Sequence, residues 1–415
     1  MSEPNRPVRI RCSFCGKDSR EARRMIAGPD GVHICDACVQ LCREIVSDDP
    51  VEEDAATSRL DEMRPSAIRS YLDTHVIGQD RAKRVLSVAV YNHFKRLRDD
   101  AGSQDEIELS KGNILLIGPT GSGKTLMART LARRLGVPFT ITDATTLTEA
   151  GYVGEDVESI VKNLWLAAGK DAELAGRGIV CLDEVDKISR GGGAGNQMRD
   201  VGGEGVQQAL LKVIESQMVS IPPEGSRNRP QQEFIQVDTR NVLFVCAGAF
   251  EGLHEIVERR LSSSAIGFGA SAHRERMSRS ELLRHVRAED LIRFGLIPEF
   301  VGRLPVIVSF DELSEGELVE VLWKPRNALV RQYRRLFELE NVKLRFHHEA
   351  LEAIVAEALG RGSGARGLRA ILEDVMLDVM YEVPGLGGVD ECVITEECVR
   401  KVAKPILHHR DQAAS

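Results

Sequence analysis

The segment GPTGSGKT at residues 118–125 restricts what this chain can fold into more than any other feature of its sequence. It follows the apolar run NILLI at 113–117 and precedes a stretch with Met127, Leu131 and Leu135 at helical spacing. Glycines let backbone N–H groups close around phosphate oxygens, and a helix that starts there points its positive end at the anion. A strand, this loop and a helix in succession predict a P-loop and disfavour a glycine-rich turn without a ligand.

The P-loop and two acidic residues further along predict a site for ATP and Mg²⁺. The nucleotide-binding residues expected in the loop are Gly118, Pro119, Thr120, Gly121, Ser122, Gly123, Lys124, Thr125 and Leu126. Lys124 would contact the β and γ phosphates, and Thr125 would ligate Mg²⁺. In IVCLDE, Asp183 would hold Mg²⁺ through water and Glu184 would polarise the attacking water. Strands often end in acids at a solvated edge, but together with the P-loop this pair favours hydrolysis over nucleotide binding alone.

Arginine is also expected at a hydrolysis site, because phosphoryl transfer spreads negative charge over the γ-phosphoryl oxygens. Two candidates lie beside glycines, where approach to the backbone is unhindered: Arg303 in GLIPEFVGRLP and Arg366 in GARGLR. For an isolated arginine, a plain surface charge is the usual role. Sequence physics alone does not choose among the 55 lysines and arginines of the chain.

A cysteine-rich segment near the N-terminus predicts a structural zinc site. The candidate ligands form two C-x2-C pairs, Cys12 with Cys15 and Cys35 with Cys38. Nineteen residues separate the pairs, a spacing that closes a tetrahedral four-cysteine site. A unit this small needs the metal to fold. Cys42 and His33 lie close by but are not expected to bind zinc, since four ligands saturate a structural site. A closed site of this kind serves recognition rather than catalysis.

Composition limits the classes of partner. The formal charge of −8, from 63 acids against 55 bases, and an aromatic content of 5% do not favour nucleic acid as the main partner. No apolar stretch is long enough to cross a bilayer, and MSEPNRPVRIRC lacks the apolar core of a signal peptide. Clustered cysteines in such a chain point to metal rather than disulfides. We therefore expect a cytoplasmic protein with neither nucleic acid nor membrane as partner.

Changes in composition and hydrophobic pattern along the chain predict an α/β fold with several domains. The expected parts are a zinc-binding domain at 1–46, a flexible acidic linker at 47–64, a doubly wound P-loop large domain at 65–310, a mainly helical small domain at 311–403 and a C-terminal tail at 404–415. The large domain alternates apolar runs with helical patterns. Its candidate strands lie at 113–117, 138–142, 179–183, 241–247 and 305–309.

No peptidase machinery is visible in the sequence. It contains no G-x-S-x-G elbow, and HEIVE at 254–258 lacks the second histidine of a zincin motif. We therefore expect ATPase activity without intrinsic peptidase activity, so that any proteolysis would need another chain.

Several motifs, in order, resemble those of the ClpX family of AAA+ ATPases across essentially the whole chain. They are VIGQDRAKRVLSVAVYNHFKRL, GPTGSGKT, GYVGEDVE, GIVCLDEVDKISR, GEGVQQALLK, FGLIPEFVGRLP and GARGLR. The resemblance implies that Val76 and Ile77 flank the adenine, and that Arg366 is the sensor arginine of the small domain. It also implies a homohexameric ring, in which Arg303 acts as an arginine finger toward a neighbouring subunit. No polar sensor residue is assigned at Ala247 in NVLFVCAGAF.

The resemblance further implies loops that grip substrate in the pore of the ring. Tyr152 and Val153 in GYVG resemble the pore loop, where a flat amphipathic ring can contact any sequence. Without the family context, a tyrosine packed in a core is an equal alternative. Arg199 lies in the expected second pore loop. The pore-entrance loop, usually Arg-Lys-His in this family, here reads Arg227, Asn228 and Arg229, which keeps two positive charges for tags that end in a carboxylate.

Ile266, Gly267 and Phe268 resemble the tripeptide by which the family docks on the ClpP peptidase. The predicted function is thus an ATP-dependent protein unfoldase and translocase that recognises tagged substrates and delivers them to ClpP. Zn²⁺ and Mg²⁺ would serve with ATP, and adaptor proteins would bind through the zinc domain. Two alternatives remain: an AAA+ nucleic-acid motor, which should show basic stripes with aromatics, and a non-hydrolysing adaptor, which would not need Glu184.

Overall fold

The computed structural model divides the chain into two compact units, Met1–Glu62 and Met63–Ser415. The residues that it describes are 11–47, 64–99, 109–148, 155–189, 203–215, 218–221, 234–263 and 277–409.

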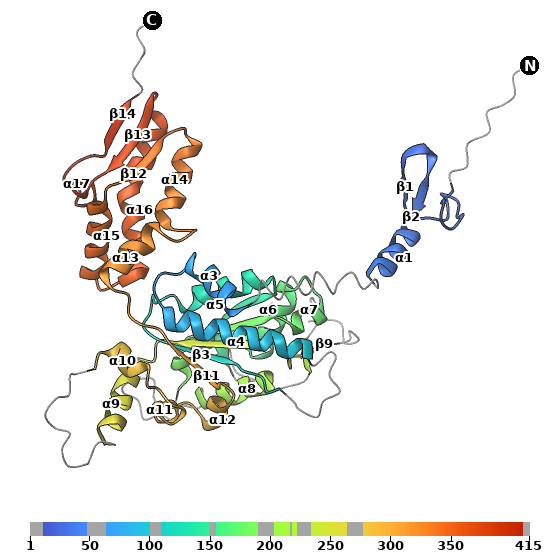
Figure 1. Cartoon of the computed structure of the whole chain (residues 1–415), viewed down its shortest axis with the longest axis horizontal. Coiled ribbons are helices and arrows are strands. Elements are labelled where there is room, and N and C mark those ends of the chain that lie inside the picture. Colours follow the sequence, from blue (N-terminus) through green and yellow to red (C-terminus); the bar gives the residue numbers. More distant parts are fainter. Residues whose placement is uncertain are drawn as a thin grey trace, which may run out of the picture. The chain divides into compact units, whose positions relative to one another are not determined.

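The first unit is a short hairpin followed by a helix (Figure 1). Strand β1 (Met25–Ala27) pairs antiparallel with β2 (His33–Cys35) across the turn η1 (Pro29–Gly31), and α1 (Asp36–Ser47) follows directly. Its buried apolar cluster consists of Cys12, Cys35 and Cys38, with half-buried neighbours around them. Among the residues of this unit that the structure describes, too few side chains are buried to offset the entropy of folding, and a bound metal would supply the missing stability.

The second unit is built on a parallel sheet of five strands in the order β11-β3-β10-β7-β4. The strands are β3 (Ile114–Ile117), β4 (Phe139–Asp143), β7 (Ile179–Asp183), β10 (Leu243–Gly248) and β11 (Val306–Ser309). The inner strands are apolar except for Asp183 at the end of β7, as expected for a sheet covered on both faces. Each of the five apolar runs found in the sequence is therefore a strand of this sheet.

Helices cover both faces of the sheet (Figure 1). They are α3 (Pro65–Asp73), α4 (Asp80–Asp99), α5 (Lys124–Leu135), α6 (Glu158–Ala167), α7 (Ala172–Gly176), α8 (Gly203–Glu215), α9 (Leu253–Ser263), α10 (Arg279–Leu283), α11 (Ala288–Phe294) and α12 (Pro298–Gly302). Side chains of β3 alternate between two cores: Ile114 and Leu116 pack with α3, α4 and α5, whereas Leu115 and Ile117 pack with α6, α8 and α12. The doubly wound α/β fold is confirmed.

Short elements connect this framework. They are η2 (Ala144–Thr146), η3 (Val185–Ile188), the parallel pair β5 (Leu147–Thr148) and β6 (Glu155–Asp156), and the antiparallel pair β8 (Val219–Ile221) and β9 (Ile235–Val237). Both η2 and η3 directly follow strands of the large sheet, so they lie at its carboxyl edge, where open α/β sheets bind ligands.

The C-terminal part of the second unit combines helices with a small sheet. Its helices are α13 (Glu315–Trp323), α14 (Leu329–Leu339), α15 (His348–Gly360), α16 (Gly364–Glu382), η5 (Val383–Gly385) and α17 (Glu396–Val399). Its strands are β12 (Lys343–Phe346), β13 (Val389–Ile394) and β14 (Ile406–His409), in the order β12-β13-β14. Helical periodicity did not predict this sheet, and β14 falls within the expected tail at 404–415, where it pairs with β13.

Within the described segments, no helix combines the length and the apolar character that a membrane span requires.

Candidate nucleotide-binding and zinc sites

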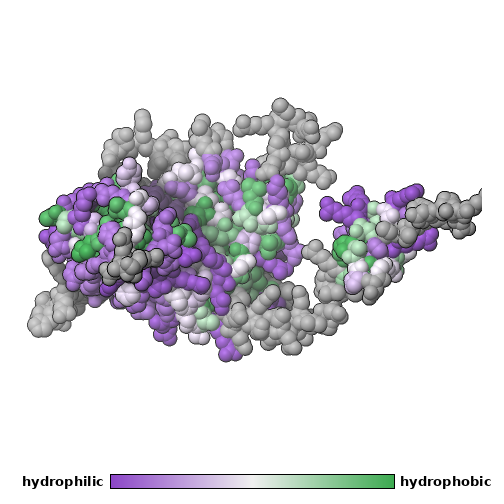
Figure 2. Space-filling view, turned by 90° about the horizontal axis from the view of Figure 1, so that it is seen from above, coloured by the Kyte–Doolittle hydropathy of each residue, from purple (hydrophilic) through white to green (hydrophobic). Residues whose placement is uncertain are grey.

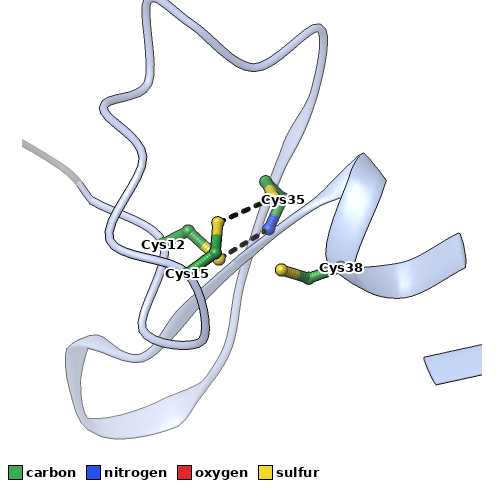
Figure 3. A group of neighbouring side chains, drawn as sticks. All are labelled: Cys12, Cys15, Cys35 and Cys38. Atoms are coloured by element: carbon green, nitrogen blue, oxygen red, sulfur yellow. Dashed lines mark hydrogen bonds between the residues drawn. The ribbon is translucent and has the colours of Figure 1, made fainter. Parts of the chain in front are cut away.

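Four cysteine thiols converge in the first unit (Figure 3). The Sγ atoms of Cys12, Cys15, Cys35 and Cys38 all lie within 4.8 Å of one another. Cys35 ends β2 and Cys38 lies in the first turn of α1, while the other two precede the hairpin. The Sγ atoms of Cys15 and Cys35 are 3.6 Å apart, close to the edge of about 3.8 Å expected for a tetrahedron with zinc–sulfur bonds of about 2.3 Å. The group fits a zinc ion.

Two of the four thiols have shifted pKa values, in opposite directions. Burial raises the pKa of the Cys12 thiol, but hydrogen bonds from neighbouring backbone N–H groups bring it down to about 6. Hydrogen bonding to the Cys15 thiol and burial raise the pKa of Cys38. A divalent cation would stabilise all four thiolates together. Cys42 and His33 are outside this group, and the His33 ring pairs with the Gly31 carbonyl at 2.9 Å.

The predicted P-loop lies between β3 and α5 at the carboxyl edge of the sheet. Gly123 precedes α5 with φ 95°, a left-handed conformation that glycine adopts without strain. At Gly118, a β carbon would lie 2.6 Å from the Phe310 carbonyl oxygen, so a side chain does not fit. The loop therefore depends on glycines for both its turn and its approach to the neighbouring strand end.

Lys124 reaches back over the loop that precedes it. Its Nζ donates to the Gly118 carbonyl at 2.6 Å and to the Pro119 carbonyl at 2.9 Å. Burial lowers the pKa of this ammonium to about 8, against the opposing effect of the Asp183 and Asp186 carboxylates, and Arg366 adds to the lowering. An anionic phosphate beside the ammonium would stabilise its charge.

The expected magnesium residues, Thr125 at the start of α5 and Asp183 at the end of β7, lie in contact. Thr125 Oγ1 donates to Asp183 Oδ2 at 2.8 Å, and the Glu184 backbone N–H donates to Asp183 Oδ1 at 3.0 Å. Glu184 has φ 58°, a left-handed conformation that is uncommon away from glycine. This conformation turns the chain sharply out of β7 at the residue expected to activate water. A hydroxyl and a carboxylate at the phosphate loop form the oxygen-rich ligand set that Mg²⁺ prefers.

A cavity of about 360 Å³ contains most of the predicted nucleotide residues. Those that line it are Thr120, Gly121, Gly123, Lys124, Thr125, Leu126, Asp183, Glu184 and Arg366. The sequence did not single out Asp186, Lys187, Ala249, Glu251 or Val321, which line it as well. Asp186 follows Glu184 in the motif DEVD, the one local signal that could have found it. Its Oδ1 accepts from the Ala249 N–H at 3.1 Å and so ties η3 to the end of β10.

Of the two predicted adenine residues, Val76 lies beside the phosphate loop. Val76 and Ile77 are buried, and Val76 Cγ1 lies 3.7 Å from the position a β carbon would take at Gly123. Lys83 fixes the segment, because its Nζ donates to the Val76 carbonyl at 2.7 Å and to Asp73 at 2.8 Å.

Arg303 lies away from the cavity, at the end of α12. Its side chain is 57% exposed and forms an ion pair with Glu215, the last residue of α8. Among the described residues that line the cavity, Arg366 is present and Arg303 is not. One copy of the chain thus assembles the phosphate site without this arginine.

The predicted pore and docking residues lie outside the described residues. These are Tyr152, Val153, Arg199, Arg227, Arg229, Ile266, Gly267 and Phe268. In sequence, their segments fall between β5 and β6, η3 and α8, β8 and β9, and α9 and α10 respectively.

Comparison with protein families yields three matches along the chain. Residues 10–48 match a family described as the ClpX C4-type zinc finger. Residues 109–307 match the AAA domain of the Cdc48 subfamily. Residues 313–396 match the C-terminal, D2-small domain of the ClpB protein. The first match covers the four cysteines, the second covers the P-loop, Asp183 and Glu184, and the third covers Arg366.

Proposed function

Since a ClpX-type zinc finger, an AAA domain and a D2-small domain follow one another in this chain, it is a ClpX-like AAA+ ATPase, and we propose that it unfolds and translocates tagged proteins. The observation that carries the proposal is the union of a hydrolytic nucleotide site with that zinc finger in one chain. ATP binding and zinc binding follow from the matched domains and the cysteine group. We propose the unfolding activity, the pore and the peptidase partner.

The proposed hydrolysis uses residues that line the cavity. Lys124 and the loop N–H groups would hold the phosphates, and Thr125 with Asp183 would hold Mg²⁺, which supplies charge neutralisation on the phosphate oxygens. Glu184 would accept the proton of the attacking water. Arg366 belongs to α16 in the C-terminal part and lines the same cavity. It would therefore couple nucleotide binding to the C-terminal part. Val76 and Ile77 would hold the base.

A ring would complete the site. Arg303 is exposed and lies apart from its own cavity, which suits a side chain that serves the site of a neighbouring copy. We therefore propose a homohexamer, in which Arg303 stabilises the charge that develops during phosphoryl transfer in the adjacent subunit.

Substrate handling would fall to the segments between the described elements. Tyr152, Val153 and Arg199 would grip the polypeptide in the pore, and Arg227 with Arg229 would receive the tag. Ile266, Gly267 and Phe268 would dock on ClpP, which would cut the unfolded chain in the cytoplasm.

The zinc unit would bind adaptors or substrates. Several of its apolar side chains are exposed, namely Phe14, Ile26, Val32, Val39 and Leu41. Figure 2 shows this unit at the right, where its surface is partly apolar and partly polar. An exposed apolar surface on so small a unit suits a protein partner.

A pair of assays on the full chain tests the proposal. A stably folded, tagged reporter is followed with ATP alone for unfolding, and with ClpP added for degradation. Phe268→Ala should lose degradation and keep unfolding, because only the docking contact is removed, whereas Tyr152→Ala should lose unfolding and keep ClpP binding. Equal loss of both activities in the Phe268 variant would contradict the division of labour. Stimulation of the ATPase by DNA rather than by unfolded protein would favour a nucleic-acid motor instead.

A further inference from the structure

Helix α12, which carries Arg303 at its end, has five residues, too few to be stable by itself. Its residues Phe300 and Val301 are buried in the core that covers one face of the large sheet. Apolar packing is not directional, however, so it does not by itself fix how far the helix slides or turns. Directional contacts at its two ends must set the position of Arg303.

A buried amide holds the start of α12. Gln207, on α8, is fully buried, and its Oε1 accepts from the N–H of Ile297, which precedes the helix, at 2.8 Å. Its Nε2 donates to the carbonyl of Ile188 at 2.7 Å. Ile188 ends η3, the turn that directly follows Glu184. One side chain therefore joins the segment behind the hydrolytic acid to the helix that carries the arginine.

A second buried amide holds the end of α12. Asn113, which precedes the P-loop strand β3, is 2% exposed. Its Nδ2 donates to the Arg303 carbonyl at 3.0 Å, and its Oδ1 accepts from the Phe244 N–H in β10 at 3.2 Å. The Asn113 carbonyl also accepts from Val306 N–H at the start of β11. The end of the helix is thus tied to the strand that leads into the phosphate loop.

Both amides use one donor and one acceptor, so their partners fix which end is oxygen and which is nitrogen. The geometry points to Gln207 and Asn113 as positioning residues for Arg303. This inference rests on the proposed role of Arg303 in a neighbouring subunit. The two amides transmit movements of β3, which leads into the phosphate loop, and of η3, whose residues Asp186 and Lys187 line the cavity, to α12. Whether a subunit's own site holds a nucleotide therefore sets the position of the Arg303 that this subunit presents to the neighbouring site.

Mixed rings of full-length chains test this inference. One subunit type carries Glu184→Gln, which silences its own site, together with a test substitution, and is mixed in excess with unmodified subunits. Hydrolysis then comes only from unmodified sites that receive an arginine from the altered neighbour. The test substitutions are Gln207→Met and Asn113→Leu, which are close in size but make neither hydrogen bond. The matched control is Gln208→Met, because Gln208 is the next residue on α8 and is exposed.

We expect both test substitutions to lower hydrolysis by the unmodified subunits about ten-fold relative to Glu184→Gln alone, since small displacements of a catalytic group are costly. Nucleotide binding by the altered subunits should be unchanged, and Gln208→Met should have no effect. Unchanged hydrolysis with both test substitutions, while Arg303→Ala in the same background lowers it, would overturn the inference. If Arg303→Ala has no effect either, the proposed role of Arg303 is what fails. Loss of nucleotide binding by both test variants would also overturn the inference, because the amides would then support the whole domain.

Discussion

The lowered pKa of Lys124 makes nucleotide affinity depend on pH. Burial brings this pKa to about 8, and a bound phosphate would raise it by favouring the ammonium. Binding should therefore take up a proton, and affinity should fall as the pH rises through about 8. At about pH 9, roughly a tenth of the empty sites carry the charge, so we expect about ten-fold weaker binding than at pH 7, or about 1.4 kcal/mol. A phosphate loses its own second proton near pH ~6, below this window.

Calorimetry with the Glu184→Gln variant and ATP measures both the nucleotide affinity and the number of protons taken up on binding. Titrations in two buffers of different ionisation enthalpy should give about 0.9 proton taken up per nucleotide at about pH 9, and almost none at about pH 7. Lys124→Arg is the matched control, because a guanidinium keeps its charge throughout this range. Affinity that does not change between these pH values, or an equal change in the arginine variant, would refute the reasoning.

Three further predictions concern hydrolysis, metal and stability. Glu184→Gln should keep ATP binding and lower phosphate release by about a hundred-fold or more, since the amide cannot accept the proton; near-normal turnover would contradict this assignment. Metal analysis should find about one zinc per chain, lost in Cys12→Ser and kept in Cys42→Ser; a native protein without zinc would disprove the site. Asp290→Ala removes the buried carboxylate that Arg260 contacts through two hydrogen bonds of 2.8 Å, and should destabilise the large domain by about 3 to 5 kcal/mol in denaturant unfolding; a loss below about 1 kcal/mol would count against this pair.

Local patterns were enough to single out the P-loop, the acidic pair and the four cysteines, which the structure brings together at one cavity and in one thiol group. The P-loop, the acidic end of β7 and the two cysteine pairs each occupy a short stretch, and each is defined by residue type at close spacing. The five apolar runs were equally clear, because a parallel sheet covered on both faces leaves little room for polar residues.

Features that depend on distant partners were not predictable. Asn113 and Arg303 are 190 residues apart in the sequence. Gln207 and Ile297 are 90 residues apart. The local sequence around these residues therefore does not predict their hydrogen bonds. The strands β12 and β14 were missed because KLRF and ILHH are only four residues long and half of those residues are polar. Arg303 could be chosen only through the family resemblance, since a single copy of the chain leaves it outside the cavity.

The order of strands in the large sheet bears on how such proteins diversify. The P-loop strand β3 lies between β10 and β11, which come from much later in the chain. The catalytic frame is therefore assembled from widely separated segments, and the stretches between them can lengthen or change composition without altering it. Insertions or substitutions at 190–202, 222–233 and 264–276, which fall between these elements in the sequence, therefore leave the order of the strands unchanged.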